Sequence, residues 1–464
     1  MDPLSLGQIA KFAGGSFAAG NADAVVTRVS TDSRTLQPGD LFVPLRGENF
    51  DGHRFVSQAV ERGAVGAMVE ENWKGEVPAG FALIRVPDTL VGYQNLAANY
   101  RQSLSLKVIA ITGSNGKTST KDFVAATLAR RFRVTKTEGN FNNHVGLPQT
   151  MLAAMREDAI AVWEIGMNHP GEIAALAKLA APDVAIITNV GLAHIEFMGS
   201  REAIAAEKGS LAEAIGADGL VILNADDAFS EQIAQRTRAR TVLAGIEKGS
   251  VRATDISQSP TGSEFTILEE AHRCRAQLPV PGMHMVQNAM LAIAAGRAFG
   301  LSLEECAVGL ASTPLTKARL QIREISGIQF IDDSYNANPD SMKAALRTLI
   351  ELEADGRRIA VLGEMGELGD ESERGHREVG EAAAALGVDR LIAVGAAGAI
   401  IAQAAQSAGL GESSAVDSPQ AAADLLGENA AAGDLILVKG SRSARMERVL
   451  EAFGKRRSTA GVTP

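Results

Sequence analysis

One stretch, Leu106 to Arg131, constrains the fold of this chain more than any other. It reads LKVIAITGSNGKTSTKDFVAATLARR. A β-branched run from Val108 to Ile111 leads into a loop with two glycines, and a helix-forming segment follows without a break. The pattern predicts a strand, a phosphate-binding loop and a helix, in that order.

The loop has the residues needed to hold an oligophosphate. Glycine can take positive φ and lets backbone N–H groups approach phosphate oxygens, and the helix N-terminus adds a partial positive charge. Lys117 is expected against the β- and γ-phosphates of ATP, and the Thr118 hydroxyl is expected to hold Mg²⁺. The predicted nucleotide loop comprises Gly113, Ser114, Asn115, Gly116, Lys117, Thr118 and Ser119.

This loop departs from the common P-loop pattern at one position. G-x-x-x-x-G-K-[ST] requires glycine at position 111, where the chain has Ile111, so the loop is a shorter G-x-x-G-K-T variant. An ordinary glycine-rich turn before a helix is the alternative. The preceding strand and the adjacent Lys-Thr pair favour the phosphate loop.

Length and charge limit the kind of protein. A chain of 464 residues is too long for one ordinary core, and about three domains are expected. The net charge of -10 gives no electrostatic case for binding nucleic acid. Cys274 and Cys306 have no metal-ligand or disulfide spacing, and no signal peptide or apolar run of about 20 residues is present. We therefore expect a cytoplasmic protein that does not insert into membranes.

The predicted fold class is α/β with three domains. Residues 1–86 are expected to form a small α/β domain, 87–314 a central domain with a mainly parallel sheet, and 315–464 a second parallel-sheet domain, since Pro314 interrupts the pattern. Strands are expected at Val25 to Val29 and at Leu41 to Leu45. The N-terminal polar cluster fits either a ligand site or ordinary loop polarity, and it comprises Asp32, Ser33, Arg34, Asn49, Asp51 and His53.

Two further strand ends carry chemistry. Ala159 to Trp163 is a predicted strand that ends at Glu164, and Val184 to Val190 leads into the loop with His194. In open parallel sheets, ligands gather beyond the carboxyl ends of the strands, so both side chains should approach the nucleotide loop. Glu164 and His194 would then suit two divalent ions around ATP. The alternatives are a helix-capping carboxylate and an ordinary loop histidine.

A predicted helix capped by Ser200 carries Lys208 about two turns in. From the local sequence alone, this lysine is a solvated surface group. Near the C-terminus, the segments GEMGELG and KGSRS follow strands, and Lys439 and Arg442 in the second suit a carboxylate or phosphate as well as a solvated helix start. The helix after DDSYNANP is expected to be capped near Asp340 or Ser341.

Taken together, these segments resemble the Mur ligases of peptidoglycan synthesis, over essentially the whole chain. TGSNGKT resembles the family's ATP loop, EIGMN its magnesium-ligand motif, and NVGLAHIEFMGSREAIAAEKG the motif with the second metal ligand. The resemblance implies a uridine-binding N-terminal domain, a central P-loop ATPase domain and a C-terminal Rossmann-like domain. It also implies that Thr118, Glu164 and His194 bind two Mg²⁺ ions, and that Lys208 is carbamylated.

The resemblance assigns further residues. Asn288, Arg319, Asp333 and Tyr335 match positions that contact ATP, and Asn140, Asn142 and Asn143 in EGNFNNHVGLP match the substrate loop. The segment TDSRTLQPGDLFVPLRGENFDGH resembles the uridine-binding domain and places Ser33 and Arg34 at the substrate. Contacts to the second substrate are open, with Asn336, Glu364 and Ser441 as candidates. Lys117, Lys208 and His194 are expected to be catalytic.

The resemblance implies an ATP-dependent ligase that works through an acyl phosphate. The relatives that add diaminopimelate or lysine are expected to carry a DNPR-type motif in the third domain, and the corresponding region of this chain reads LGEMGELGDE instead. We therefore expect D-alanyl-D-alanine to be joined to UDP-N-acetylmuramoyl-tripeptide by a monomeric enzyme. Three alternatives stay open: another Mur-type ligase that adds a single amino acid, a folylpolyglutamate synthase, and a nucleotide-dependent scaffold without catalysis.

Overall fold

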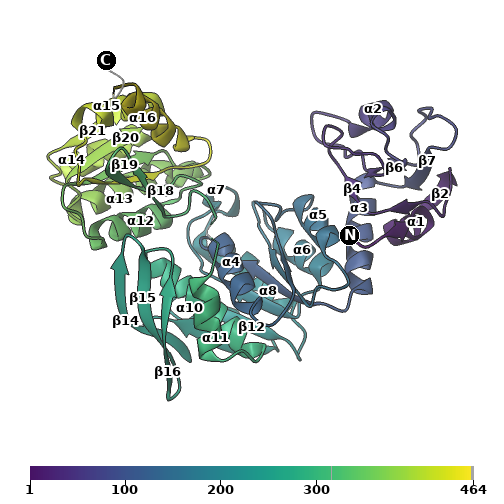
Figure 1. The fold of residues 1–464 in the computed structure, drawn as a ribbon, viewed down its shortest axis with the longest axis horizontal. Coiled ribbons are helices and arrows are strands. Elements are labelled where there is room, and N and C mark those ends of the chain that lie inside the picture. Colours follow the sequence, from purple (N-terminus) through teal and green to yellow (C-terminus); the bar gives the residue numbers. More distant parts are fainter. Residues whose placement is uncertain (315, 461–464) are drawn as a thin grey trace.

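The chain folds into three α/β units, each built on its own sheet (Figure 1). The computed structural model describes residues 1–314 and 316–460. The N-terminal unit lies at one end of the long axis, the C-terminal unit at the other, and the central unit between them. The predicted three-domain α/β fold is confirmed. The borders after residues 86 and 314 stay predictions, and residue 315 lies outside the described residues.

The N-terminal unit has a five-stranded sheet in the order β2-β7-β6-β5-β4 and a separate β1–β3 pair. The expected strand at Val25 to Val29 is split, because its first half pairs with β1 and its second half with β5. The strand expected at Leu41 to Leu45 is shorter and ends at Phe42. Its elements are β1 (Leu4–Ser5), α1 (Leu6–Ala13), β2 (Ser16–Ala19), β3 (Val25–Val26), β4 (Val29–Ser30), β5 (Leu41–Phe42), η1 (Gly52–Phe55), α2 (Val56–Glu61), β6 (Gly66–Glu70) and β7 (Ala82–Val86).

The central unit has a nine-stranded sheet in the order β16-β15-β14-β13-β12-β11-β8-β10-β9. Strands β8 to β14 run parallel, and the predicted β-rich insertion adds β15 and β16 antiparallel at one edge. Its strands are β8 (Lys107–Thr112), β9 (Val134–Lys136), β10 (Ile160–Glu164), β11 (Val184–Ile187), β12 (Leu220–Asn224), β13 (Arg240–Gly245), β14 (Val251–Ser259), β15 (Gly262–Glu269) and β16 (His272–Leu278).

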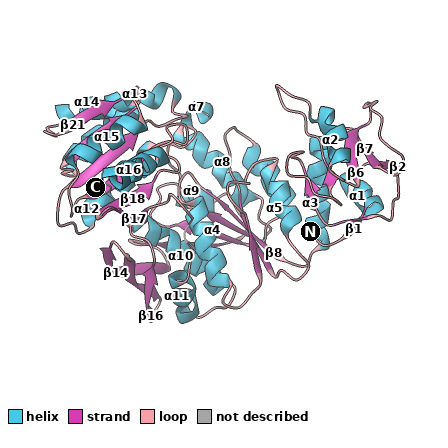
Figure 2. Cartoon of the chain, turned by 45° about the horizontal axis from the view of Figure 1, so that its top comes forward, coloured by secondary structure: helices cyan, strands magenta, loops and turns pink. Residues whose placement is uncertain are grey.

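Helices lie on both sides of the central sheet (Figure 2). Ser200 accepts a hydrogen bond from the N–H of Ala203 and caps α8, as predicted. The helices are α3 (Thr89–Ser103), α4 (Lys117–Leu128), α5 (Gly146–Ala153), α6 (Glu172–Ala180), α7 (Ile195–Met198), α8 (Arg201–Glu213), α9 (Ser230–Ala234), α10 (Met283–Ala298) and α11 (Leu303–Ala311).

The C-terminal unit has a six-stranded sheet in the order β17-β18-β22-β19-β20-β21, with only β17 antiparallel. The cap expected near Asp340 or Ser341 is instead Asn338, whose side chain accepts from the N–H of Ser341 at 2.9 Å, with Pro339 in the first turn. Its elements are β17 (Gln321–Ile325), β18 (Ile328–Asp333), α12 (Pro339–Glu351), β19 (Arg358–Gly363), η2 (Gly369–Glu371), α13 (Ser372–Ala385), β20 (Arg390–Val394), α14 (Gly398–Ser407), β21 (Ser413–Val416), α15 (Pro419–Asn429), β22 (Leu435–Lys439) and α16 (Glu447–Ala460).

The central strands are apolar along their whole length. Every residue of β10, β11 and β12 is buried, as expected for a parallel sheet covered on both faces. Trp163 is fully buried in β10, directly before Glu164. Among the described residues, none of the helices has the length and apolar character that crossing a bilayer requires.

Trp163 offers a stability test for the core beneath the site. Its indole N–H is buried and has no hydrogen-bond partner among the described residues, so the side chain contributes through packing. We expect Trp163→Ala to cost about 3–5 kcal/mol and Trp163→Phe clearly less, because phenylalanine leaves a smaller cavity and no lost hydrogen bond. Urea unfolding followed by circular dichroism measures both. Equal losses in the two variants would contradict this packing role.

Candidate active site

The predicted phosphate loop connects β8 to α4 at the centre of the large sheet. Gly113 has a φ of 151° and Gly116 a φ of 80°. A Cβ on Gly113 would lie 1.8 Å from the Thr188 hydroxyl, so only glycine fits there. Lys117 Nζ donates to the Gly113 carbonyl at 2.6 Å, which folds the lysine back over the loop. The strand, loop and helix follow the sequence prediction.

Hydrogen bonds with the segment after β11 hold this loop in place. Asn189 follows β11, and its Oδ1 accepts from the Asn115 N–H at 2.9 Å, while its backbone carbonyl accepts from the Ser114 N–H at 3.0 Å. Ser114 Oγ also accepts from the N–H of Gly191 at 2.8 Å. The loop is therefore fixed to the end of the neighbouring strand without a ligand.

Glu164 joins three segments at the end of β10. It is 3% exposed, and its Oε2 accepts from the Thr118 hydroxyl at 2.9 Å. Its Oε1 accepts from Asn142 Nδ2 at 2.7 Å, which ties in the predicted substrate loop. Glu164 N donates to Thr137 Oγ1 at 2.9 Å. The carboxylate is thus fixed beside the nucleotide loop, as the strand-end argument predicted.

The C-terminal unit reaches the same place. Arg319 Nη2 donates to Thr118 Oγ1 at 3.0 Å, and its guanidinium lies over the Tyr335 ring at 4.3 Å. Arg319 Nε is buried and has no hydrogen-bond partner among the described residues. Asn338 Nδ2 donates to Asn115 Oδ1 at 2.8 Å. A cation with an unused donor over the phosphate loop favours an anionic ligand here.

Three titratable side chains from two units lie close together in the cavity lining: His284, Asp333 and Lys439. Lys439 is 3% exposed on its side chain, and its Nζ donates to Asp333 Oδ2 at 2.6 Å and to the Asn336 carbonyl at 2.9 Å. Burial lowers the pKa of His284 to about 4, with Asp333 opposing this and Lys439 adding to it. His284 is therefore neutral near pH 7.

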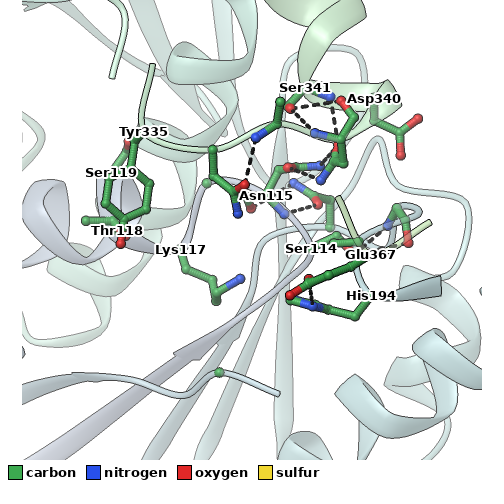
Figure 3. Close-up of a pocket in the computed structure, with 18 of the residues that line it drawn as sticks. Ser114, Asn115, Lys117, Thr118, Ser119, His194, Tyr335, Asp340, Ser341 and Glu367 are labelled. Carbon is green, nitrogen blue, oxygen red and sulfur yellow. Dashed lines mark hydrogen bonds and ion pairs between the residues drawn. The ribbon is translucent and has the colours of Figure 1, made fainter. Parts of the chain in front are cut away.

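His194 faces the C-terminal unit. Its Nδ1 lies 2.6 Å from Glu367 Oε2, in the GEMGELG segment after β19 (Figure 3). This contact holds the pKa of Glu367 below its ordinary value, against the opposing effect of burial. The predicted metal ligand is thus paired with a carboxylate from another unit.

Lys208 is a buried lysine close enough to Lys117 for their charges to interact. It is 1% exposed, so the surface position suggested by its local sequence is wrong. Burial lowers its pKa far below the ordinary value, the charge of Lys117 lowers it further, and Glu207 raises it. Burial is also the main reason that the pKa of Lys117 is lowered, with Glu164 raising it and Arg319 lowering it.

These residues surround a cavity of about 800 Å³ between the central and C-terminal units. The close-up shows Asp340 and Ser341 above Ser114 and Asn115, and His194 next to Glu367 (Figure 3). The predicted site residues that line the cavity are Ser114, Asn115, Gly116, Lys117, Thr118, Ser119, Asn140, Asn142, Asn143, Glu164, His194, Asn288, Arg319, Asp333, Tyr335, Asn336, Lys439, Ser441 and Arg442.

Other predicted site residues are outside this lining, among them the dipeptide candidate Glu364. Gly113 lies behind the loop against Thr188, and Lys208 is buried in α8. Ser33 and Arg34 belong to the N-terminal unit, where Ser33 is buried and the exposed Arg34 pairs with Asp32 at 2.8 Å. The cavity therefore unites the nucleotide loop with the predicted substrate loop, and the predicted uridine contacts lie elsewhere.

The donor set fits magnesium that is bound together with phosphate. No group of three or more histidine, cysteine, aspartate or glutamate side chains in the described part of the chain could hold a metal alone. Mg²⁺ keeps several waters and is usually held by one or two carboxylates plus substrate phosphates. Glu164 and Thr118 supply such hard oxygen donors beside the phosphate loop.

Sequence reasoning missed several lining residues. Asn189, Asn338 and Asp340 join the loop and the C-terminal unit, and the Asp340 carboxylate accepts from the Leu192 N–H at 3.0 Å. Each is a short polar side chain in a loop or helix cap, for which the local sequence predicts turns and caps equally well. The sequence held one indication of Glu367 as a site residue, because its segment GEMGELG directly follows a predicted strand.

Comparison with known proteins agrees with this geometry. Three family models match, described as Mur ligase family, catalytic domain (residues 25–101), Mur ligase middle domain (111–296) and Mur ligase, glutamate ligase domain (318–442). The UDP-N-acetylmuramoyl-tripeptide--D-alanyl-D-alanine ligase of Bacillus subtilis (strain 168) is 43% identical over 431 residues, covering 92% of this chain and 93% of the relative.

Solved structures agree as well. The crystal structure of MurF from Acinetobacter baumannii matches with a TM-score of 0.90 at 34% identity, covering 98% of this chain and 99% of that one. MurF ligase from Thermotoga maritima in complex with ADP matches with a TM-score of 0.82 at 28% identity, covering 93% and 98%. From the family models and the identity over nearly its whole length, we conclude that this chain belongs to the Mur ligase family.

Proposed function

We propose that this chain is an ATP-dependent ligase that joins D-alanyl-D-alanine to UDP-N-acetylmuramoyl-tripeptide. The observation that carries this function is the 43% identity, over nearly the full length of both chains, with a relative named for that reaction. The cavity supports it, since a phosphate loop, buried cations and a fixed carboxylate meet between two units. The products are the UDP-linked pentapeptide, ADP and phosphate.

The reaction has two steps. The terminal carboxylate of the tripeptide attacks the γ-phosphorus of ATP, which breaks the bond to ADP and gives an acyl phosphate. The amine of the dipeptide then attacks the acyl carbon, loses a proton and expels phosphate. Lys117 and Arg319 place positive charge where two anions meet, which lowers the cost of their approach.

We propose that two Mg²⁺ ions bind here. The side chains proposed to hold them are Thr118, Glu164 and His194. Bound Mg²⁺ supplies charge neutralisation at the phosphate oxygens. Glu164 is already oriented by Thr118 and Asn142, so its carboxylate needs no rearrangement of the backbone to act as an oxygen ligand. His194 also lines the cavity and would contribute a ring nitrogen.

We further propose that Lys208 is carbamylated. Its amine has a strongly lowered pKa, so the neutral, nucleophilic form is accessible near pH 7. The neutral amine adds to CO₂ and loses a proton, which leaves a carbamate anion close enough to Lys117 for their charges to interact. The anion attracts the Lys117 cation and would provide a carboxylate-like oxygen donor.

The remaining predicted roles complete the substrate assignments. Asn288, Asp333 and Tyr335 are proposed to contact ATP, and the substrate loop residues Asn140, Asn142 and Asn143 the tripeptide end of the first substrate. Ser33 and Arg34 are proposed at its uridine end, and Asn336 near the dipeptide. We also propose that the protein is a monomer in the cytoplasm and that its domains are residues 1–86, 87–314 and 315–464.

Phosphate release tests the function directly. The purified protein is incubated with Mg·ATP and UDP-MurNAc-tripeptide, with D-alanyl-D-alanine or a free amino acid as second substrate. We expect release that requires the dipeptide, with a pentapeptide product by mass spectrometry. Release that requires a single amino acid would indicate another Mur-type ligase, and no release with any acceptor would indicate a binding role.

Lys117→Met tests the cation at the phosphate loop. Methionine keeps most of the stem but removes the charge and the hydrogen bond to the Gly113 carbonyl. Loss of a positioned charge-stabilising group costs about 10²–10³-fold in turnover, and we expect at least that loss in kcat. The thermal midpoint of the ligand-free variant should stay near that of the parent. Unchanged kcat would remove Lys117 from the proposed chemistry.

Lys208→Ala tests the carbamate. We expect it to lose most activity and to recover part of it with formate or acetate, because a small carboxylate can occupy the space and charge of the missing carbamate. Lys178→Ala, which removes an exposed lysine on α6, is the control and should keep full activity. Failure of every short carboxylate to restore turnover would argue against the carbamate.

A further inference from the structure

Helix α4 carries two buried charged side chains outside the cavity. Lys121 and Asp122 are 2% and 3% exposed, and neither is among the residues that line the large cavity. Taking an ion out of water costs free energy, which only paired charges and hydrogen bonds offset. The contacts of the Asp122 carboxylate therefore show which segments it holds together.

The two oxygens of Asp122 have different partners. Oδ1 accepts from Lys136 Nζ of β9 at 2.6 Å and lies 3.6 Å from Lys121 Nζ, so these charges balance within the central unit. Oδ2 accepts from the Thr316 hydroxyl at 2.5 Å. Thr316 begins the segment 316–320, which leads into β17 of the C-terminal unit and is called the linker here. The second oxygen thus anchors the linker to α4.

The linker makes another contact with α4, one turn nearer the phosphate loop. Thr118 and Asp122 are four residues apart and therefore lie on the same face of the helix. Arg319, three residues beyond Thr316, donates to the Thr118 hydroxyl at 3.0 Å. Asp122, Thr316 and Arg319 also line one small cavity. Two hydrogen bonds therefore hold the linker alongside α4, and the bond to Asp122 fixes the end that is farther from the phosphate loop.

The backbone on both sides of Arg319 is left-handed. Ala318 has a φ of 59° and Leu320 a φ of 50°, and neither is glycine. This conformation is uncommon for such residues, so the surrounding structure must hold it in place. Asp333 Oδ1 accepts from the Leu320 N–H at 3.3 Å, and the Tyr335 N–H donates to the Ala318 carbonyl at 3.3 Å. The C-terminal unit thus holds one end of the linker while α4 holds the other.

We propose that Asp122 and Thr316 are positioning residues, which aim the Arg319 guanidinium at a phosphate group held by the loop. The inference rests on the proposed function for ATP as the ligand. Arg319 Nε is buried without a hydrogen-bond partner among the described residues, so its direction decides whether a phosphate oxygen can reach it. Affinity for the nucleotide then depends on a carboxylate that lies outside the cavity.

Hydrogen exchange in the ligand-free, full-length protein tests the anchor. Thr316→Val keeps the shape of the side chain but removes the hydroxyl, which releases the linker from α4 at one end. We expect faster exchange in the peptides that contain the Leu320 and Tyr335 N–H groups, followed by mass spectrometry. Thr316→Ser keeps the hydroxyl and should exchange like the parent. Thr313→Val is the matched control, because the Thr313 hydroxyl donates to the Gly309 carbonyl of α11 at 3.4 Å.

Binding of the non-hydrolysable analogue Mg·AMP-PNP, measured by calorimetry, tests the route through Arg319. We expect Thr316→Val to weaken binding by about 3–10-fold, the effect of one lost hydrogen bond, and Thr316→Ser and Thr313→Val to leave it unchanged. Arg319→Ala should weaken binding more, and addition of Thr316→Val to Arg319→Ala should cause no further loss. Asp122→Asn, which removes the anchoring charge, should weaken binding through the same route.

The outcomes separate this inference from the proposed function. Parent-like exchange in Thr316→Val would overturn the anchor, whichever reaction the protein catalyses. An equal loss of affinity in the parent and in the Arg319→Ala background would overturn the route through Arg319. Failure of the phosphate-release assay with every acceptor would count against the proposed function, whereas exchange and affinity would still decide the role of Asp122 and Thr316. Thr316 is half-buried, so its substitutions leave the core packed.

Discussion

The hydrogen bond from Thr118 to Glu164 is the junction on which the site depends. It joins the first turn of α4 to the end of β10, and both partners are buried. Asn142 reaches the same carboxylate from the predicted substrate loop, and Arg319 reaches the same hydroxyl from the C-terminal unit. Four segments distant in sequence therefore converge on one pair of side chains. Displacement of either partner would misplace the others.

Parallel strand order makes this junction possible. β8 lies between β10 and β11, so the loop after β8 and the strand ends at Glu164 and Asn189 occupy adjacent positions along one edge of the sheet. That arrangement could be predicted from the sequence, because apolar runs alternate with helices and ligands gather where parallel strands end. Sequence reasoning also identified the loop glycines, the Ser200 cap and Glu164. Each of them depends on local chemistry or on the direction in which a strand runs.

The contacts between units could not be predicted in this way. Asn338 was missed as the cap of α12, although Pro339 after it is a known start signal. Its second contact, with Asn115, spans 223 residues and leaves no local trace. The burial of Lys208 could not be predicted either, because the residue pattern of α8 does not show that other parts of the protein cover this lysine. Short N-terminal strands such as β3 and β4 depend on partners that the local pattern does not identify.

The contacts between the central and C-terminal units around the cavity are polar. Around the cavity, the C-terminal unit meets the central unit through hydrogen bonds at Asn115, Thr118 and Leu192 and through the ion pair at His194. A hydrogen bond exchanged for another of similar kind changes the free energy by only about 1 kcal/mol, whereas a buried donor left alone costs more. Phosphate oxygens can therefore replace the protein acceptors one at a time at little cost. Arg319 has a buried Nε without a hydrogen-bond partner among the described residues, so a bound phosphate would add a hydrogen bond there. The ligand-free contacts hold the two units in register while leaving the anionic substrate the better partner.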